Sequence, residues 1–355
     1  MSDNCFNFNV IEASLNSSFD LKQIKKITDK YNIEYNPKEV DKTIILETED
    51  GDIVGTASTD GNIIKAVVVD DKYQGSNAFS VLISSLSEEL SQEYKHIFIY
   101  THPKNKQIFT GLGFKCIAEA PPYYSLYEFG FSTIDKYKKY LETKLVNTAK
   151  NSACIVMNCN PFTLGHQYLI EKAAKESDAV YVFIVETDKS LFPFKTRWDL
   201  VEKGVAHLDN VVLVKTDDYL VSKVSFPSYF LKDKGASEIT DNQARLDLMV
   251  FLNHIVPVLN IKKRYVGTEN YCPVTSAYNK QMHLLLPKHN VEVVEVERKS
   301  LKEDDYISAS QIREAVKNDD WDTIKDRVPK TTYDFLVSEA GKPIVEKIKN
   351  SDSRH

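Results

Sequence analysis

Cysteine is scarce in this chain, and no two cysteines have the spacing of a metal-ligand pair. The 355 residues include five cysteines, an odd number, and none belongs to a CxxC motif. This excludes a regular disulfide framework and a zinc site built from closely spaced thiolates, and it is typical of a protein from a reducing cytosol. The five are Cys5, Cys116, Cys154, Cys159 and Cys272.

Long apolar runs are also missing. The longest, at residues 248–259, is interrupted by Asn253, His254 and Pro257. It falls short of the roughly 20 apolar residues that a membrane-spanning helix requires. The first five residues show no basic segment followed by an apolar one, so no signal peptide is recognisable. We therefore expect no membrane partner and a cytoplasmic location.

Positive charge is not in excess either. The chain has 45 Lys+Arg against 51 Asp+Glu, which gives a formal net charge of −6. Because binding to a nucleic-acid backbone needs clustered cations, we expect no nucleic-acid partner. Hydrophobic residues make up 42% and charged residues 27%, as in an ordinary globular protein. At roughly 100–200 residues per domain, the length suggests two domains.

The first part of the chain, residues 1–130, has the pattern of an α+β domain. Asp-Gly turns, which tolerate the positive φ of tight hairpins, separate three short strands. A helix with apolar periodicity and a further strand follow. The expected elements are strands at 43–47, 53–57, 63–69 and 96–101, and a helix over 79–90.

Residues 151–350 have a different rhythm, in which apolar strands alternate with helices. Continuous apolar runs are typical of strands buried on both faces. The expected strands are 153–157, 180–185, 211–214, 264–267 and 291–296, and a long helix is expected at 243–259. This alternation predicts an α/β domain with a parallel, doubly wound sheet. A helical connector with solvated lysines is expected at 131–150.

The loop at residues 158–166, with the sequence NCNPFTLGH, lies between the first parallel strand and its helix. Open α/β sheets bind ligands at this edge. Gly165 would let a phosphate approach the backbone, and the helix N-terminus offers unpaired amides to an anion. Thr163 and His166 are three residues apart and can face the same ligand. A histidine near a capping threonine is common without function, so the whole string carries the prediction.

That string resembles the TxGH form of the HxGH signature of the nucleotidyltransferase superfamily. A second signature of that superfamily, ISxSxIR, is matched by residues 307–313, ISASQIR. The resemblance implies a Rossmann-like domain that binds ATP, with His166 on the α-phosphate and Thr163 on the triphosphate. The other residues expected around ATP are Asn160, Phe162, Gly165, Arg197, Gly267, Thr268, Glu269, Ser308, Ser310 and Arg313. Mg²⁺ is expected with ATP, although the sequence identifies no ligands for it.

Further segments narrow the resemblance to the citrate (pro-3S)-lyase ligases, also called acetate:citrate-lyase ligases, over most of the chain. These segments are residues 160–163, 192–194, 200–204, 226–230, 266–269 and 272–275. The resemblance implies an enzyme that uses ATP and acetate to acetylate a thiol on citrate lyase. That thiol belongs to the CoA-like prosthetic group of the acyl carrier subunit, and the reaction proceeds through acetyl adenylate with release of AMP and pyrophosphate. No enzyme thiol is needed, so we interpret Cys159 and Cys272 as packing residues.

The first domain is similar to the GNAT acetyltransferases, whose strand-to-helix turn grips the pyrophosphate of coenzyme A. The matching turn contains Gln74, Gly75, Ser76 and Asn77. It departs from the usual pattern, because Lys72 replaces Arg or Gln and Asn77 replaces a second small residue. Two interpretations therefore stay open, a docking site for the CoA-like arm and a scaffold that no longer binds it.

Two other functions are compatible with the same signatures. An adenylyltransferase of the phosphopantetheine or nicotinamide mononucleotide type would leave AMP attached to its second substrate. A non-catalytic regulator would bind ATP and CoA without releasing pyrophosphate. The additional first domain and residues 272–275 favour the ligase over the adenylyltransferase, and the presence of Thr163, His166 and Arg313 argues against the regulator.

Overall fold

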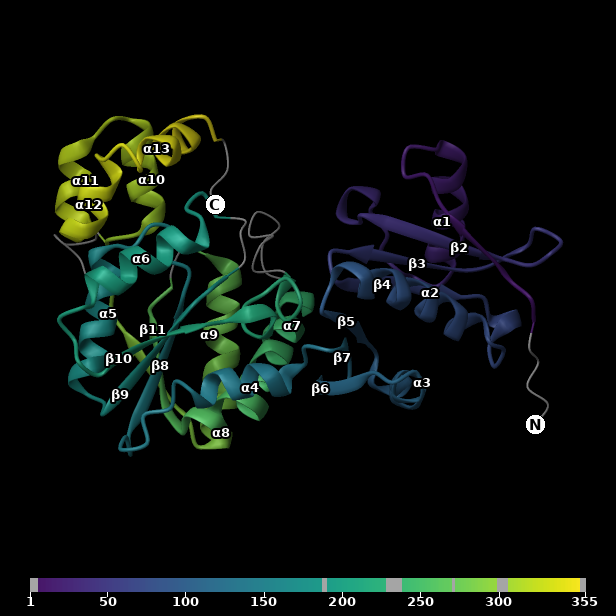
Figure 1. Cartoon of the computed structure of the whole chain (residues 1–355), viewed down its shortest axis with the longest axis horizontal. Coiled ribbons are helices and arrows are strands. Elements are labelled where there is room, and N and C mark those ends of the chain that lie inside the picture. The colour runs from purple at the N-terminus through teal and green to yellow at the C-terminus, as the bar shows by residue number, and fades with distance from the viewer. Residues whose placement is uncertain (1–5, 187–189, 228–237, 270–271, 299–305, 352–355) are drawn as a thin grey trace. The chain divides into compact units, whose positions relative to one another are not determined.

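The computed structural model describes residues 6–186, 190–227, 238–269, 272–298 and 306–351. Of the segment 226–230 singled out above, residues 228–230 lie outside this range. The chain forms two compact units, Met1–Asp135 and Lys136–His355, which are coloured purple to blue and blue to yellow in Figure 1. The division falls inside the segment expected to connect the domains. In the described residues, no helix has both the length and the apolar character needed to cross a bilayer.

The first unit is built on a seven-stranded sheet of order β1-β2-β3-β4-β5-β7-β6. All neighbours are antiparallel except β4 and β5. The strands are β1 Asn9–Glu12, β2 Lys42–Glu47, β3 Ile53–Asp60, β4 Ile63–Val69, β5 His96–Thr101, β6 Lys115–Ala120 and β7 Tyr124–Gly130. The helices are α1 Ser18–Lys30, α2 Ala78–Glu93 and α3 Lys106–Gly111.

The hairpin prediction for this unit is confirmed. Gly51 and Gly61, at the two Asp-Gly turns, have φ of +84° and +58°, a conformation that glycine adopts without steric cost. Helix α2 packs on the sheet through residues at helical spacing, among them the fully buried Leu82, Ile83 and Leu86. Because this stripe and the sheet face bury one another, the expected α+β domain forms.

The second unit contains a five-stranded sheet in which every pair is parallel, of order β10-β9-β8-β11-β12. The strands are β8 Ser152–Met157, β9 Ala179–Ile184, β10 Val211–Lys215, β11 Ile261–Gly267 and β12 Glu292–Val296. The order confirms the predicted doubly wound sheet, because the chain leaves the central β8 in one direction and returns to its other side at β11.

Helices cover both faces of this sheet. On one face α5 Leu164–Lys175 and α6 Phe194–Gly204 follow β8 and β9, and on the other lie α7 Glu238–Val250, α8 Val256–Leu259 and α9 Pro273–Leu285 (Figure 1). The helix expected at 243–259 is interrupted by a π-helical turn, Phe251–Ile255. Pro257 follows it and has no N–H to donate, so regular α-helical bonding cannot continue through it. Helix α4, Ile134–Glu142, contains the division between the units.

Four helices end the described chain, namely α10 Ala309–Lys317, α11 Trp321–Arg327, α12 Lys330–Leu336 and α13 Lys342–Lys349. Figure 1 shows them, in yellow-green, gathered at one end of the second unit near α6. Ile312, Ile324 and Leu336 join the same core as β8 and β9. The second signature, which enters α10, is thereby brought to the sheet.

Candidate active site

The loop after β8 lies at the carboxyl edge of the central strand, where parallel sheets place their ligand sites. Residues 159–163 of this loop are all buried. Cys159 has a φ of +53°, and burial raises the pKa of its thiol. A buried thiol with a raised pKa is the opposite of an activated nucleophile. This geometry is consistent with its interpretation as a packing residue.

Thr163 begins α5 and forms a reciprocal capping box with His166. The His166 amide donates to Thr163 Oγ1 at 3.3 Å, and the Thr163 amide donates to His166 Nδ1 at 3.1 Å. A backbone N–H can only donate, so Nδ1 accepts and carries no proton. In the neutral imidazole the proton is then on Nε2, which is the nitrogen left to donate to a ligand.

The environment of His166 favours this neutral form. Burial, and to a lesser extent the positive charge of Arg298, lower its pKa to about 4. The fully buried ring of Phe162 stacks beside the imidazole, with centroids 6.1 Å apart and planes 15° apart. At neutral pH the side chain is therefore a neutral hydrogen-bond donor, oriented by Thr163 and Phe162.

Arg197, on α6, lies fully inside the protein beneath this loop. Its Nη1 donates to the carbonyls of Asn158 and Val185 at 2.9 and 2.6 Å, and its Nε donates to the carbonyl of Phe192 at 3.0 Å. The Phe192 amide in turn donates to Asn160 Oδ1 at 3.1 Å. The predicted site residues Arg197 and Asn160 thus join the loops that follow β8 and β9.

The two sequence signatures, far apart in the chain, meet directly. Arg313 on α10 donates through Nη1 to the carbonyl of Asn160 at 2.5 Å and through Nη2 to Ser310 Oγ at 3.2 Å. Burial lowers the Arg313 pKa to about 10, so the guanidinium stays charged at neutral pH. Ser308 begins α10, where its hydroxyl accepts from the Gln311 amide at 3.2 Å.

Gly165 explains how closely these signatures approach. A Cβ at this position would lie 3.2 Å from the carbonyl oxygen of Ile307, the first residue of the second signature. The sequence predicted that Gly165 makes room for a phosphate. What the structure shows is that Gly165 makes room for the neighbouring backbone of Ile307. Phe162 is held in a similar way, because its carbonyl accepts from Thr332 Oγ1 at 3.0 Å and its ring lies against Gly204.

The end of β11 lies at the same edge of the sheet. Gly267 pairs with Val296 of β12, and the Thr268 amide donates to the Val296 carbonyl at 3.0 Å. Glu269 Oε2 accepts from Arg298 Nη2 at 2.5 Å, and Arg298 Nε donates to the Thr268 carbonyl at 2.7 Å. The expected residues Gly267, Thr268 and Glu269 therefore form a structured strand end.

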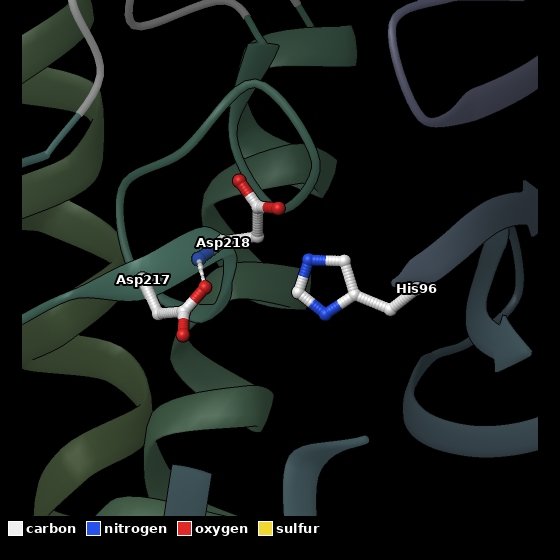
Figure 2. Close-up of side chains that lie close together, drawn as sticks. All are labelled: His96, Asp217 and Asp218. Carbon is white, nitrogen blue, oxygen red and sulfur yellow. Dashed lines mark hydrogen bonds between the residues drawn. The ribbon is translucent and has the colours of Figure 1, made fainter. Parts of the chain in front are cut away.

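The turn after β10 lies at this carboxyl edge too, because it follows the end of a parallel strand of the same sheet. Figure 2 shows its residues Asp217 and Asp218. The Asp218 amide donates to Asp217 Oδ1 at 2.8 Å, and the Asp217 amide donates to Glu186 Oε2 at 2.7 Å. Burial raises the pKa of Glu186. His96, also drawn in Figure 2, belongs to the first unit and is not part of this turn. The carboxylates of Asp217 and Glu186 each hold the backbone of the turn.

Comparison with known proteins decides among the functions left open above. Residues 152–336 match the family model described as the citrate lyase ligase C-terminal domain. The citrate (pro-3S)-lyase ligase of Haemophilus influenzae is 36% identical over 84% of this chain and 90% of its own length. The corresponding ligase of Escherichia coli K12 is 33% identical over 85% and 87%.

The chain belongs to the citrate lyase ligase family. A phosphopantetheine adenylyltransferase of Clostridium perfringens is 27% identical over 40% of this chain and 92% of its own length. This weaker and shorter match agrees with the shared nucleotidyltransferase signatures, but it leaves most of the chain unmatched. The adenylyltransferase alternative is therefore not favoured.

The first unit matches a GNAT acetyltransferase domain model over residues 12–124, which confirms the predicted fold. Its turn before α2 is held by bonds within the turn and by bonds to Phe6 and Tyr31. Gln74 Nε2 donates to Asp71 at 2.5 Å, Ser76 Oγ donates to the Tyr73 carbonyl at 2.6 Å, and Asn77 exchanges two hydrogen bonds with the backbone of Phe6. Gly75 has a φ of +82° and open space around it.

Arg298 is the residue of this site that the sequence reasoning missed. A signal for it existed, because the last strand was expected to end at Val296 and the carboxyl ends of parallel strands meet at one edge. Arg298 lies two residues beyond that end. Its importance depends on contacts with Thr268 and Glu269, about thirty residues away in sequence, which no local pattern reveals.

Proposed function

We propose that this chain uses ATP and acetate to acetylate the prosthetic-group thiol on the acyl carrier subunit of citrate lyase, with release of AMP and pyrophosphate. Family membership supports ATP-dependent acetylation of the lyase. The single observation that carries the chemistry is the contact of Arg313 with the Asn160 carbonyl. It brings the start of α10 beside a neutral His166, and both signatures then face one triphosphate.

In the first step, a carboxylate oxygen of acetate attacks the α-phosphorus of ATP. The bond from this phosphorus to the bridging oxygen of the β-phosphate breaks, and pyrophosphate leaves with its electron pair. His166 donates its Nε2 proton in a hydrogen bond to an α-phosphate oxygen, where charge develops in the transition state. Thr163 keeps the imidazole in this tautomer through the bond from its amide to Nδ1.

The N-terminal end of α10 is the proposed site of the β- and γ-phosphates. A helix start presents unpaired amides and a partial positive charge to an anion. Ser308 and Ser310 add hydroxyls there, and Arg313 contributes a positive charge that its backbone contact holds in place. For Arg197 we propose an indirect role, in which it fixes the loop beneath the phosphates, because its described bonds go to three backbone carbonyls and to Asn158 Oδ1.

Mg²⁺ enters this proposal as the partner of ATP. Glu269 is bonded to Arg298 and to the Cys272 amide, and Glu186 and Asp217 hold their own turn. The carboxylates of Glu269, Glu186 and Asp217 thus already have protein partners. The ion fits best as one held by phosphate oxygens and water, which is a common mode for Mg²⁺, and it would neutralise charge on the leaving pyrophosphate.

In the second step, the thiol sulfur of the prosthetic group attacks the carbonyl carbon of acetyl adenylate. The bond from that carbon to the AMP oxygen breaks, AMP leaves, the thiol proton passes to solvent and a thioester forms. The burial of Cys159 and the raised pKa of its thiol argue against it as an intermediate carrier. We propose that the thiol that reacts belongs to the carrier subunit.

The deciding experiment mixes the full-length protein with ATP, Mg²⁺, acetate and deacetylated citrate lyase. We expect lyase activity to return in proportion to the AMP released. The lyase is first shown to be competent by chemical acetylation. Absence of reactivation by the enzyme, or a product in which AMP stays attached to the second substrate, would refute the proposal.

A further inference from the structure

Arg298 occupies a position where the ends of two neighbouring strands fix it. Its Nε donates to the Thr268 carbonyl at 2.7 Å, and its Nη2 donates to Glu269 Oε2 at 2.5 Å. Thr268 is itself bound to the end of β12 by its amide. The guanidinium is therefore held against the end of β11 by a carbonyl on one side and a carboxylate on the other.

The three arginines around the site loop differ in what they can still bind. The Arg197 side chain is 0% exposed and the Arg313 residue 7% exposed, and both donate to backbone of the loop. The Arg298 side chain is 25% exposed, whereas its partner Glu269 is 9% exposed. Its two described bonds use two of the five N–H donors of a guanidinium, so Arg298 keeps donors on a solvent-accessible side.

A second observation places this cation in the electrostatic environment of the catalytic histidine. The positive charge of Arg298 is, after burial, the other cause that lowers the pKa of His166. Charges in proteins influence one another strongly only at short range. His166 follows β8 and Arg298 follows β12, and both of these strands pair with β11, so the two residues lie at the same carboxyl edge of the sheet.

We infer that Arg298 binds a phosphate oxygen of ATP in the adenylation step, and that Glu269 and Thr268 are positioning residues that aim its guanidinium. A planar guanidinium forms strong, paired hydrogen bonds with phosphate. It remains protonated throughout and transfers no proton. The added positive charge stabilises the oxygen that leaves with pyrophosphate. This inference rests on the proposed function for the identity of the step, but the ATP contact can be measured without acetate.

The test compares Arg298→Met, Arg298→Lys and Lys263→Met in the full-length protein. Lys263 is a matched control, because it lies on β11, the strand whose end holds Arg298, its side chain is also 25% exposed, and it pairs with Glu292 at 3.7 Å. Calorimetry with ATP and no acetate should show about 10- to 100-fold weaker binding for Arg298→Met. Arg298→Lys keeps the charge but loses the planar fork, so a smaller loss is expected, and Lys263→Met should bind as the wild type does.

An NMR titration of His166 supplies a measurement that would not change if Arg298 had a purely structural role. Arg298→Met should raise the His166 pKa, whereas Arg298→Lys and Lys263→Met should leave it low. The resonance is assigned by its loss in His166→Ala. Unchanged ATP affinity in a folded Arg298→Met protein overturns the inference. A rise in the KM of this variant for acetate, with no rise in its KM for ATP, also overturns it.

These experiments distinguish two further outcomes. If Arg298→Met does not fold by circular dichroism, Arg298→Lys decides the question, because wild-type ATP affinity in that variant contradicts the contact. If the wild type binds ATP but catalyses no acetate-dependent pyrophosphate exchange, the proposed function fails. The calorimetric comparison then still decides whether Arg298 contacts ATP.

Discussion

Two loops in this chain each join a strand to a helix, yet they are built in opposite ways. The loop between β8 and α5 buries residues 159–163, and its helix begins with a reciprocal capping box at Thr163. The loop between β4 and α2 leaves residues 71–77 exposed or half-buried, and Asn77 begins its helix without a side-chain capping bond.

The two loops differ in how deeply the groups that hold them are buried. Arg197 and Arg313 are buried, reach the first loop from α6 and α10 and donate to its carbonyls. The second loop is held by bonds within the turn, by Phe6 and by the half-buried Tyr31, whose hydroxyl accepts from the Asp71 amide at 2.7 Å. Catalysis that depends on positioned donors needs a geometry that does not relax during the reaction. The loop between β8 and α5 meets that condition. The described bonds of the loop between β4 and α2 do not show such a fixed geometry.

The largest effect should come from His166→Ala. Loss of one donor aimed at developing charge typically lowers the rate by about 10²–10³, while folding should be nearly unaffected. Acetate-dependent ATP–pyrophosphate exchange measures the change. His207→Ala is the control, since His207 is an exposed histidine paired with Glu171 at 3.1 Å. Near-normal exchange in the His166 variant would remove the catalytic role from the first loop.

Arg197→Met tests whether the rigidity of the first loop comes from outside it. The substitution leaves the carbonyls of Asn158, Val185 and Phe192 without their buried donor. We expect the free energy of unfolding to fall by about 2–4 kcal/mol, with loss of exchange activity. Urea denaturation measures the free energy of unfolding. The control is Lys195→Met, on the exposed side of the same helix, which should change stability by less than about 0.5 kcal/mol. Equal stability of the two variants contradicts the comparison.

The pH dependence of stability should carry the signature of His166. Its folded pKa of about 4 lies below the usual histidine pKa of 6.5, so the folded state binds fewer protons than the unfolded state between these values. Stability is therefore fully present above pH 6.5 and falls as the pH decreases toward 4, by about 1–2 kcal/mol. Denaturation of the wild type and His166→Ala at pH 7 and pH 5 measures this. An identical pH slope in both proteins would contradict the lowered pKa of the His166 imidazole.

The sequence predicted the strands and the site loop well, because their signals are local. Residues 63–69 and 96–101 were placed at the observed bounds of β4 and β5, and the buried apolar runs placed β8 and β9 within a residue at each end. The sequence missed the π-helical turn before Pro257. It also gave no position for β1, β6, β7, α1 or α11 to α13.

The contacts that complete the site could not be predicted from the same patterns. The motifs at 160–163 and 307–313 indicate two phosphate-binding segments, but not that Arg313 donates to the Asn160 carbonyl or that Gly165 lies against Ile307. Such contacts depend on the packing of α10 on the sheet. The sequence predicted a phosphate contact for Arg197. Burial inside the fold instead directs its Nε and Nη1 to the backbone carbonyls of Asn158, Val185 and Phe192.

The smallest effect is expected in the second loop. Ser76→Ala and Asn77→Ala remove half-buried or exposed bonds, so each should lower stability by less than about 1 kcal/mol. Because Asn77 stands where a small residue would admit a pyrophosphate, and its side chain is bound to Phe6, we expect the KM for the carrier subunit to change less than about twofold. Exchange without the carrier should be unaltered. A KM several times higher for the carrier, with normal exchange, would instead make this loop the docking site of the CoA-like arm. The way in which this loop is bonded could then no longer be taken to indicate that it binds no ligand.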